Sequence, residues 1–302
     1  MNSTPKDINT RQNDVLHEGI AGMTALEGAQ YLLSASLDKA QVPSMDAYPF
    51  NLPVCRNLQE LKFHPHVTFF IGENGTGKST ILEAIAVALG MNAEGGSKNF
   101  NFSTNATHSP LHEALTLVRG FKYPKDSYFL RAESFYNVAS EIERLDSESG
   151  WTPPPPIINS YDGRPLHPQL SGLSLSGGSQ PIINSYGGYS LHAQSHGESF
   201  FALLMERFRG NGLYILDEPE AALSPTRQLS LLARLHELVR ANSQFIIATH
   251  SPILMAYPDS VIYELTENGI RQVEYTDTEH YAVTREFLNH HEEMLRNILE
   301  GE

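Results

Sequence analysis

Short apolar runs alternate with amphipathic segments along most of this chain, which is the pattern of an α/β protein. The apolar runs predict buried strands at residues 66–71, 127–130, 213–217 and 244–249. Apolar residues at helical spacing predict helices at 79–89, 135–145, 198–208, 225–240 and 283–299. A hairpin is expected at 261–275, with its turn at Asn268-Gly269. Strands that alternate with helices favour a three-layer α/β domain with a parallel sheet.

The remaining segments have weaker patterns. Residues 15–35 are read as an amphipathic, partly helical segment, and residues 1–35 together as a partly disordered N-terminal extension. The stretch from Tyr48 to Phe63 is predicted to form a pair of strands. We expect the main domain to cover residues 36–302 and to contain an irregular insertion at about 146–194.

The insertion contains an internal repeat. Residues 156–169 recur as residues 181–194, with ten of fourteen positions identical. A solenoid needs at least three repeats, so a local duplication within a surface loop is the favoured interpretation. An introduced linker is the alternative, because Ser176–Ser179 reads Ser-Gly-Gly-Ser.

Composition narrows the class of protein. The single cysteine excludes an internal disulfide framework and a four-cysteine metal site. The chain has no apolar run near the ~20 residues of a membrane span and no apolar leader, so we expect a cytoplasmic protein without a membrane partner. Most of the net charge of −14 is concentrated in residues 132–150, 214–222 and 276–302, which contribute −4, −3 and −5. A surface that faces nucleic acid is therefore not excluded, and two acidic helices are candidate docking surfaces for a basic partner.

A glycine-rich loop follows the predicted strand at 66–71. It satisfies the pattern G-x-x-x-x-G-K-[ST] and leads directly into a helix. Such a loop turns backbone N–H groups toward phosphates, while its lysine neutralises their charge and its serine binds Mg²⁺. The alternative is a glycine-rich turn without a ligand. The predicted nucleotide-binding residues are Gly72, Glu73, Asn74, Gly75, Thr76, Gly77, Lys78, Ser79 and Thr80.

Two other predicted strands end in polar residues. Asp217 and Glu218 follow the run at 213–216, and His250 follows the run at 245–248. The carboxyl ends of parallel strands form the ligand crevice of such a sheet. Asp217 is therefore predicted to hold Mg²⁺ through a water molecule and Glu218 to act as general base for the attacking water. His250 is predicted to contact the γ-phosphate or that water. The alternatives are an acidic turn and a structural histidine.

These motifs resemble the Walker A, Walker B and switch motifs of ABC-type ATPases, and the chain looks most like the soluble AAA family ATPases of the SMC/RecF-like class. The resemblance covers about residues 36–302 and implies a mixed sheet with additional N-terminal antiparallel strands. It also implies a signature motif that binds the partner subunit's ATP, with Ser195, Gly197 and Glu198 at its positions; a plain helix cap is the alternative. Ala221–Ser224 resembles a D-loop. The usual Q-loop glutamine is not evident, and Glu133 stands near its place as a candidate metal ligand.

The resemblance implies an ATP-hydrolysing switch with ATP and Mg²⁺ as cofactors, which forms a homodimer around two nucleotides and drives a protein partner or a DNA transaction. A nucleotide-binding adaptor of a defence or toxin–antitoxin complex, with little turnover of its own, is the alternative. A basic cluster of Arg119, Lys122, Lys125 and Arg131 is the only candidate DNA contact, with a solvated face as the other interpretation. Tyr48 and Arg56 are the candidate adenine contacts.

Overall fold

The computed structural model describes residues 30–97, 109–148 and 196–301. A seven-stranded sheet with strand order β10-β9-β3-β8-β7-β6-β4 lies at its centre. Its parallel strands are β3 (Val67–Ile71), β6 (Asp126–Arg131), β7 (Gly212–Asp217), β8 (Gln244–Ala248) and β9 (Ser260–Thr266). The antiparallel strands β4 (Gly96–Ser97) and β10 (Gly269–Val273) form the two edges.

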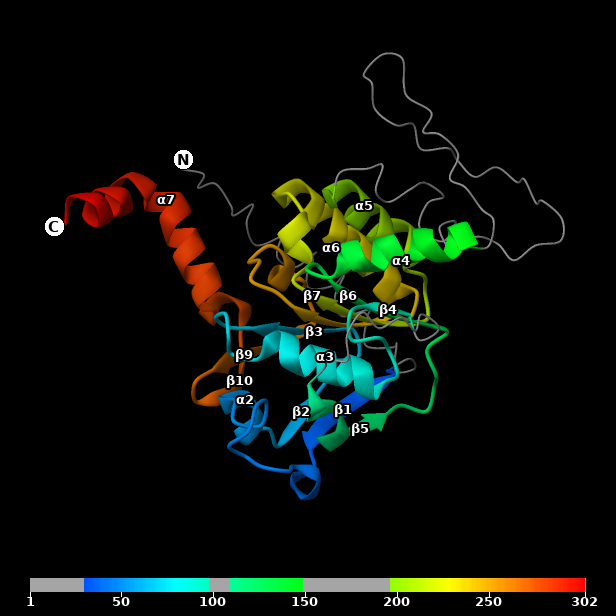
Figure 1. Cartoon of the computed structure of the whole chain (residues 1–302). Helices are drawn as coiled ribbons and strands as arrows, with labels where there is room; N and C mark the ends of the chain where they lie inside the picture. The colour runs from blue at the N-terminus through cyan, green and yellow to red at the C-terminus, as the bar shows by residue number, and fades with distance from the viewer. Residues whose placement is uncertain (1–29, 98–108, 149–195, 302) are drawn as a thin grey trace, which may run out of the picture.

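Helices cover both faces of this sheet (Figure 1). The helices α4 (Phe135–Glu148), α5 (His196–Ala202) and α6 (Pro225–Arg240) lie on one face, and α3 (Lys78–Ala88) lies on the other. Residues of β3, β7 and β8 contribute alternately to the two hydrophobic cores that result. This alternation explains why these strands appear in the sequence as continuous apolar runs. The prediction of a three-layer α/β domain is confirmed.

A second sheet packs beside α3, as Figure 1 shows. It has the antiparallel order β2-β1-β5 and consists of β1 (Leu32–Leu37), β2 (Glu60–Lys62) and β5 (Leu115–Arg119). The expected mixed sheet with N-terminal antiparallel strands is therefore present. Short helical turns connect the larger elements: η1 (Lys39–Gln41), η2 (Pro110–Ala114), η5 (Leu203–Arg207), η6 (Pro219–Ala222), η7 (Leu254–Ala256) and η8 (Tyr275–Asp277).

Two local predictions near the N-terminus were wrong. The stretch from Tyr48 to Phe63 forms the short helix α2 (Pro53–Arg56) followed by β2, because Pro53 occupies the first turn of a helix, where its missing N–H is tolerated. The C-terminal part of the predicted helical segment 15–35 is instead the start of β1. The buried Gln244 side chain bonds the backbone of Leu32 on both sides, accepting from its N–H at 2.9 Å and donating to its carbonyl at 2.8 Å.

The other predicted elements are found within a few residues of their expected ends. The exception is the last helix, α7 (Glu279–Glu300), which begins four residues earlier than predicted and has a non-helical residue, His290, within it. Within the described part of the chain, no helix is both long and apolar enough to cross a membrane. The repeat at 156–169 and 181–194 and residues 1–29 lie outside the described residues.

Candidate nucleotide-binding site

The predicted phosphate-binding and catalytic residues meet at the carboxyl ends of the parallel strands of the central sheet. Lys78 and Ser79 follow β3, Asp217 and Glu218 end β7, and His250 follows β8. The three strands are parallel neighbours in the order β3-β8-β7, so their carboxyl ends lie side by side. The fold therefore brings together residues that are up to 172 positions apart between Lys78 and His250.

The loop before α3 depends on its glycines. Gly72, Gly75 and Gly77 have φ of 137°, 83° and 100°, a region that other residues rarely adopt. A Cβ at Gly72 would lie 2.3 Å from the Leu265 carbonyl oxygen, and one at Gly77 would lie 2.6 Å from Val54 Cγ1. The loop can therefore pack against β9 and α2 only with glycine at these positions.

Lys78 lies over this loop. Its Nζ donates to the carbonyl oxygens of Gly72 at 2.8 Å and Glu73 at 2.9 Å, and the residue is only 4% exposed. Burial lowers the pKa of Lys78, and the carboxylates of Glu218 and Asp217 oppose this shift. The N-terminus of α3 has no side-chain cap, so its first N–H groups are available to an anion. This arrangement fits a nucleotide phosphate.

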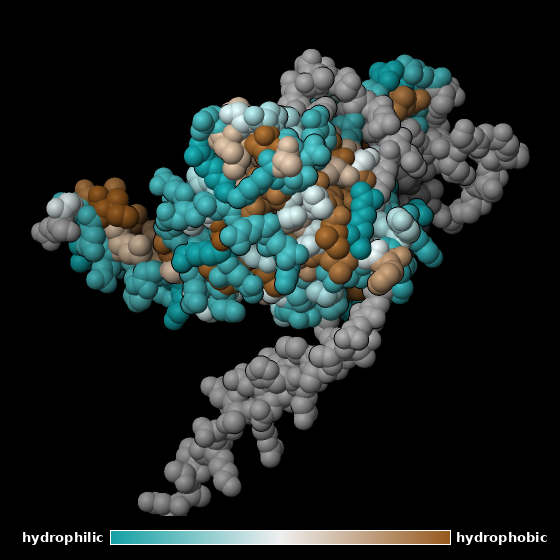
Figure 2. Space-filling view, turned by 90° about the horizontal axis from the view of Figure 1, so that it is seen from below, coloured by the Kyte–Doolittle hydropathy of each residue, from teal (hydrophilic) through white to brown (hydrophobic). Residues whose placement is uncertain are grey.

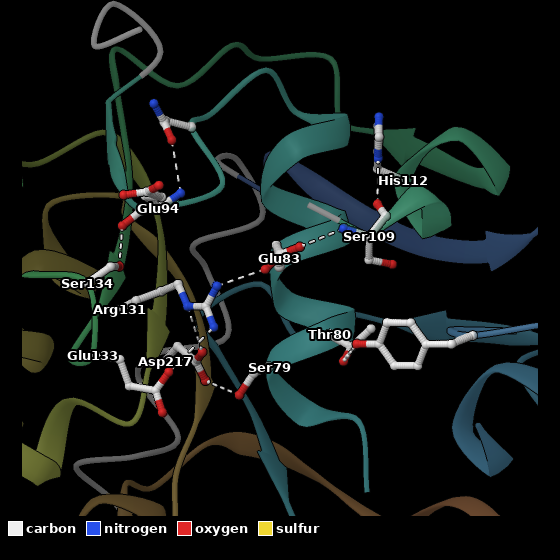
Figure 3. Close-up of polar contacts among 12 residues, drawn as sticks. Ser79, Thr80, Glu83, Glu94, Ser109, His112, Arg131, Glu133, Ser134 and Asp217 are labelled. Carbon is white, nitrogen blue, oxygen red and sulfur yellow. Dashed lines mark hydrogen bonds and ion pairs between the residues drawn. The ribbon is translucent and has the colours of Figure 1, made fainter. Parts of the chain in front are cut away.

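Ser79 and Asp217 face each other beside the lysine (Figure 3), with the Ser79 hydroxyl donating to Asp217 Oδ1 at 3.0 Å. Burial raises the pKa of Asp217 to about 6, although Arg131 and the Ser79 hydroxyl both favour its charged form. A buried carboxylate with a raised pKa is stabilised by an added cation. A hydroxyl and a carboxylate are the oxygen ligands that Mg²⁺ prefers, so this pair fits the predicted magnesium position.

Arg131 was predicted only as a member of the basic cluster, and sequence reasoning missed its place beside Asp217. It ends β6, and its register partner on β7 is Asp217. Its guanidinium lies 2.7 Å from Glu83 Oε2, 3.4 Å from Asp217 Oδ2 and 3.9 Å from Glu133 Oε2 (Figure 3). Arg131 therefore lies in the candidate nucleotide-binding site, and the basic cluster proposed as a DNA contact loses one of its four members. The sequence did contain a signal for this role, because Arg131 directly follows a predicted strand and the carboxyl ends of parallel strands lie together.

Glu133 lies at the mouth of the site, with its side chain 85% exposed. A pocket of about 170 Å³ opens between this residue and the carboxylates. The pocket is lined by Ser79, Ala132, Glu133, Asp217, Glu218, Ala221 and Ala222. Glu133 thus faces the predicted metal and water positions, while Asp217 rather than Glu133 contacts Ser79.

Glu218 and His250 lie beside each other across the β7–β8 boundary. Glu218 has the left-handed backbone conformation, with φ of 51°, and its N–H donates to the Ala248 carbonyl at 3.0 Å. Its Oε1 lies 3.5 Å from His250 Nε2. The backbone N–H of His250 in turn donates to Glu220 Oε1 at 2.6 Å. Asn and Asp adopt this conformation more readily than Glu, so its presence at Glu218, next to the other candidate catalytic residues, supports a functional position.

The other predicted contacts are only partly described. Gly197 and Glu198 lie in the first turn of α5, and Ser195 lies outside the described residues. The Tyr48 hydroxyl lies 3.5 Å from Thr80 Oγ1, which brings this tyrosine to the edge of the phosphate loop. Arg56 instead forms an ion pair with Asp46 at 3.1 Å.

A second polar cluster lies at the amino ends of the parallel strands, where His64 and His66 precede β3 and Asp259 precedes β9. Their ligand atoms are close enough to suggest a metal site. However, Nδ1 of His64 accepts from the backbone N–H of His66 at 3.2 Å and of Val67 at 3.4 Å. A metal-bound neutral histidine carries a proton on its other ring nitrogen, so this hydrogen-bond pattern disfavours a metal on His64.

Two family models match the sequence. One is described as "AAA domain" and matches residues 50–129, which include the phosphate loop. The other is described as "AAA domain, putative AbiEii toxin, Type IV TA system" and matches residues 187–256, which include Asp217, Glu218 and His250. Both matched segments are therefore similar to P-loop AAA domains. No curated protein matches this chain significantly.

Several solved structures are similar to this chain at low sequence identity. An ABC transporter ("An inward-facing conformation of a putative metal-chelate type ABC transporter") is 16% identical over 84% of this chain and 88% of its own, with a TM-score of 0.44. The SMC head domain from Thermotoga maritima is 14% identical over 81% of this chain and 99% of its own, with a TM-score of 0.39. The protein cbiO1 from Clostridium perfringens is 15% identical over 86% and 96%, with a TM-score of 0.40.

Proposed function

We propose that this protein is an ATP-hydrolysing molecular switch that forms a dimer around two ATP molecules and their Mg²⁺ ions. The observation that supports it best is the convergence of Lys78, Ser79, Asp217, Glu218 and His250 on one sheet edge. Lys78 supplies a positive charge for the phosphates, and Ser79 and Asp217 supply oxygen ligands for magnesium. Glu218 supplies a carboxylate base, and His250 supplies a neutral hydrogen-bond donor. A phosphoryl-transfer site needs these parts, because positioning and charge stabilisation dominate that reaction.

Each residue has one task in this proposal. Lys78 exchanges its bonds to the Gly72 and Glu73 carbonyls for phosphate oxygens, so its charge is released to the ligand. Ser79 and Asp217 hold Mg²⁺, which supplies charge neutralisation at the phosphates. Glu218 accepts the proton of the attacking water, and His250 orients that water or the γ-phosphate. Gly197 and Glu198, together with Ser195, are proposed to face the nucleotide of the second protomer.

Glu218→Gln tests the switch. The variant keeps the shape of the site but removes the base, so ATP accumulates unhydrolysed. We expect light scattering to show a dimer with ATP and Mg²⁺ and a monomer without ATP. Lys78→Ala is the matched control, because it removes phosphate binding and is expected to remain monomeric. A Glu218→Gln protein that binds ATP yet remains monomeric would contradict the proposal of a dimer around two ATP molecules.

A second candidate is a nucleotide-binding adaptor within a toxin–antitoxin or defence complex. The match of residues 187–256 to a family described by a type IV toxin–antitoxin system favours it. Acidic helices such as α7 would then contact the basic surface of a protein effector. Steady-state ATPase assays of the chain alone separate the candidates. Tight ATP binding with hydrolysis at the background rate would favour the adaptor, and turnover abolished by Glu218→Gln would favour the switch.

A further inference from the structure

His250 has a second histidine on its far side. Its Nδ1 lies 3.2 Å from Nε2 of His280, with the two ring centroids 5.4 Å apart. His280 belongs to the first turn of α7. One of these two nitrogens must carry the hydrogen of this bond, and the donor determines the tautomer of both rings.

The environment of the opposite ring nitrogen favours one direction for this hydrogen bond. Nε2 of His250 is buried, has no hydrogen-bond partner among the described residues and lies 3.5 Å from Glu218 Oε1. An ionised carboxylate only accepts hydrogen bonds, so this position favours a proton on Nε2. Burial is the main cause that lowers the pKa of both histidines, which keeps each ring neutral with one proton. Nδ1 of His250 is then the acceptor, and His280 is the donor.

The helix that carries His280 is attached to the domain almost only at this end. Thr278 is fully buried and caps α7 by accepting from the Tyr281 N–H at 3.3 Å, while its hydroxyl donates to the Tyr275 carbonyl at 2.8 Å. None of the side chains within α7 is buried. Figure 1 shows the rest of the helix leaving the domain, and Figure 2 shows a hydrophobic patch at its protruding end.

We propose that His280 is a positioning residue: it donates to Nδ1 of His250, fixes the tautomer that directs Nε2–H toward Glu218, and so links the base of α7 to the nucleotide site. The tautomer follows from the contacts among His250, His280 and Glu218 and does not depend on the proposed function. The link to ATP rests on the proposed function. The helical part of α7 before His290, residues 279–289, is roughly 16 Å long, so a change of direction at its base is carried outward along the helix.

The tautomer can be measured without nucleotide by ¹⁵N NMR of the full chain labelled at histidine, with His250 assigned from its missing signals in His250→Gln. We expect a single Nε2-protonated form in the wild type and a mixture of tautomers in His280→Ala. His280→Gln is the matched variant, because its amide N–H replaces the donor, and it is expected to keep the wild-type form. An Nδ1-protonated His250, or an unchanged spectrum in His280→Ala, would overturn the proposal.

Kinetics test the consequence for ATP. We expect His280→Ala to lower kcat about tenfold with KM within about twofold, and His280→Gln to recover most of the loss. An unchanged kcat in an active His280→Ala enzyme contradicts the positioning role. If the wild type itself has no turnover, the proposed ATPase function fails, while the NMR result still decides the role of His280.

The link to α7 can be followed by electron–electron spin distances. The only cysteine, Cys55, is buried, so labels at Ala233→Cys on α6 and Asn297→Cys on α7 are selective. In a Glu218→Gln background, with the labelled chain diluted into unlabelled protein so that distances between protomers do not contribute, ATP with Mg²⁺ is expected to shift the distance distribution, and the shift is expected to be lost with His280→Ala. A distribution that ignores bound ATP, or that shifts equally without His280, contradicts the link.

Discussion

The two ends of the parallel strands hold polar clusters of opposite character. The carboxyl ends, called here the carboxyl edge, carry the candidate site, and the amino ends, called the amino edge, carry His64, His66 and Asp259. At the carboxyl edge, buried polar atoms are left without hydrogen-bond partners. Of the five such atoms among the described residues, four lie here: Arg131 Nε, Glu220 Oε2, His250 Nε2 and His280 Nδ1. Two of these atoms lie near an opposite charge without forming a hydrogen bond, Arg131 Nε at 3.4 Å from Asp217 Oδ2 and His250 Nε2 at 3.5 Å from Glu218 Oε1. Buried polar groups usually have hydrogen-bond partners, so their concentration at one edge favours a surface that a ligand completes.

At the amino edge the polar groups satisfy one another. Asp259 lies 3.0 Å from His66 Nδ1 and 3.5 Å from His64 Nε2, and His64 Nδ1 takes two backbone N–H groups. These contacts join the starts of β3 and β9, which are parallel neighbours. Similar residue types therefore serve two purposes, and the satisfaction of their hydrogen bonds, rather than their proximity, separates a candidate site from a structural cluster.

The largest expected effect separates the edges by activity. Glu218→Gln is expected to lower kcat by about 10²–10⁴-fold, because the general base is lost, with little change in ATP affinity. Asp259→Asn is the control at the amino edge, since asparagine tolerates the left-handed φ of 53° at this position. Its kcat is expected to stay within about twofold of the wild type. Single-turnover and steady-state assays measure both, and a comparable loss in Asp259→Asn would remove the distinction.

The next effect concerns stability at the carboxyl edge. A pKa raised to about 6 for Asp217 means that the folded state favours the protonated carboxyl. The stabilisation is therefore complete below the ordinary Asp value and is lost as pH rises through about 6. Two pKa units or slightly more correspond to about 3 kcal/mol. In EDTA, Asp217→Asn is expected to be more stable than the wild type at pH 8 by up to this amount.

Urea unfolding between pH 4.5 and pH 8 measures that difference, and Mg²⁺ with ATP is expected to reverse its sign. Ser79→Ala is the matched control, because it removes a hydrogen bond to Asp217 without removing the buried charge. A stability difference that does not change with pH would show that Asp217 is ionised at no cost.

The sequence predicted the carboxyl edge better than the amino edge for a physical reason. Walker residues follow long apolar runs, and parallel strands place their ends together whatever their separation in the chain. Arg131 was missed because its role depends on the register that sets it opposite Asp217. His280 was missed because only the fold brings the start of α7 to His250.

Short elements were also hard to predict. The strand β1 is stabilised by Gln244, a side chain 212 positions away from Leu32, and β2 has only three residues. The local sequence pattern contains no sign of the contact with Gln244. A strand as short as β2 also gives too little alternation to be recognised, so the segment from Tyr48 to Phe63 was predicted as two strands. The hairpin of β9 and β10 was predictable, because Asn268-Gly269 specifies its turn locally.

A smaller effect is expected at the amino edge. Asp259→Ala removes the acceptor of both histidines and is expected to lower the free energy of unfolding by about 1–2 kcal/mol. Burial lowers the pKa of His64 more than Asp259 raises it. The contribution of neutral His64 to the free energy of unfolding is therefore present above the ordinary histidine pKa and is lost as pH falls. The pH dependence is thus opposite to that of Asp217. Denaturant unfolding of His64→Gln, which is expected to weaken this acid-side loss, checks the sign.

The smallest effect tests which candidate contacts the adenosine part of the nucleotide. Tyr48 is exposed and its hydroxyl approaches Thr80, whereas Arg56 is already paired with Asp46. An aromatic ring that stacks on a base contributes about 1 kcal/mol, so Tyr48→Ala is expected to raise the Kd for ATP about fivefold, and Tyr48→Phe to change it little. Arg56→Ala is the control and is expected to leave Kd within about twofold, because surface ion pairs contribute little. Calorimetric titration with ATP and with inorganic triphosphate separates ring stacking from phosphate contact, since only ATP binding depends on the ring. An equal loss for both ligands in Tyr48→Ala would instead place the tyrosine at the phosphate loop, next to Thr80.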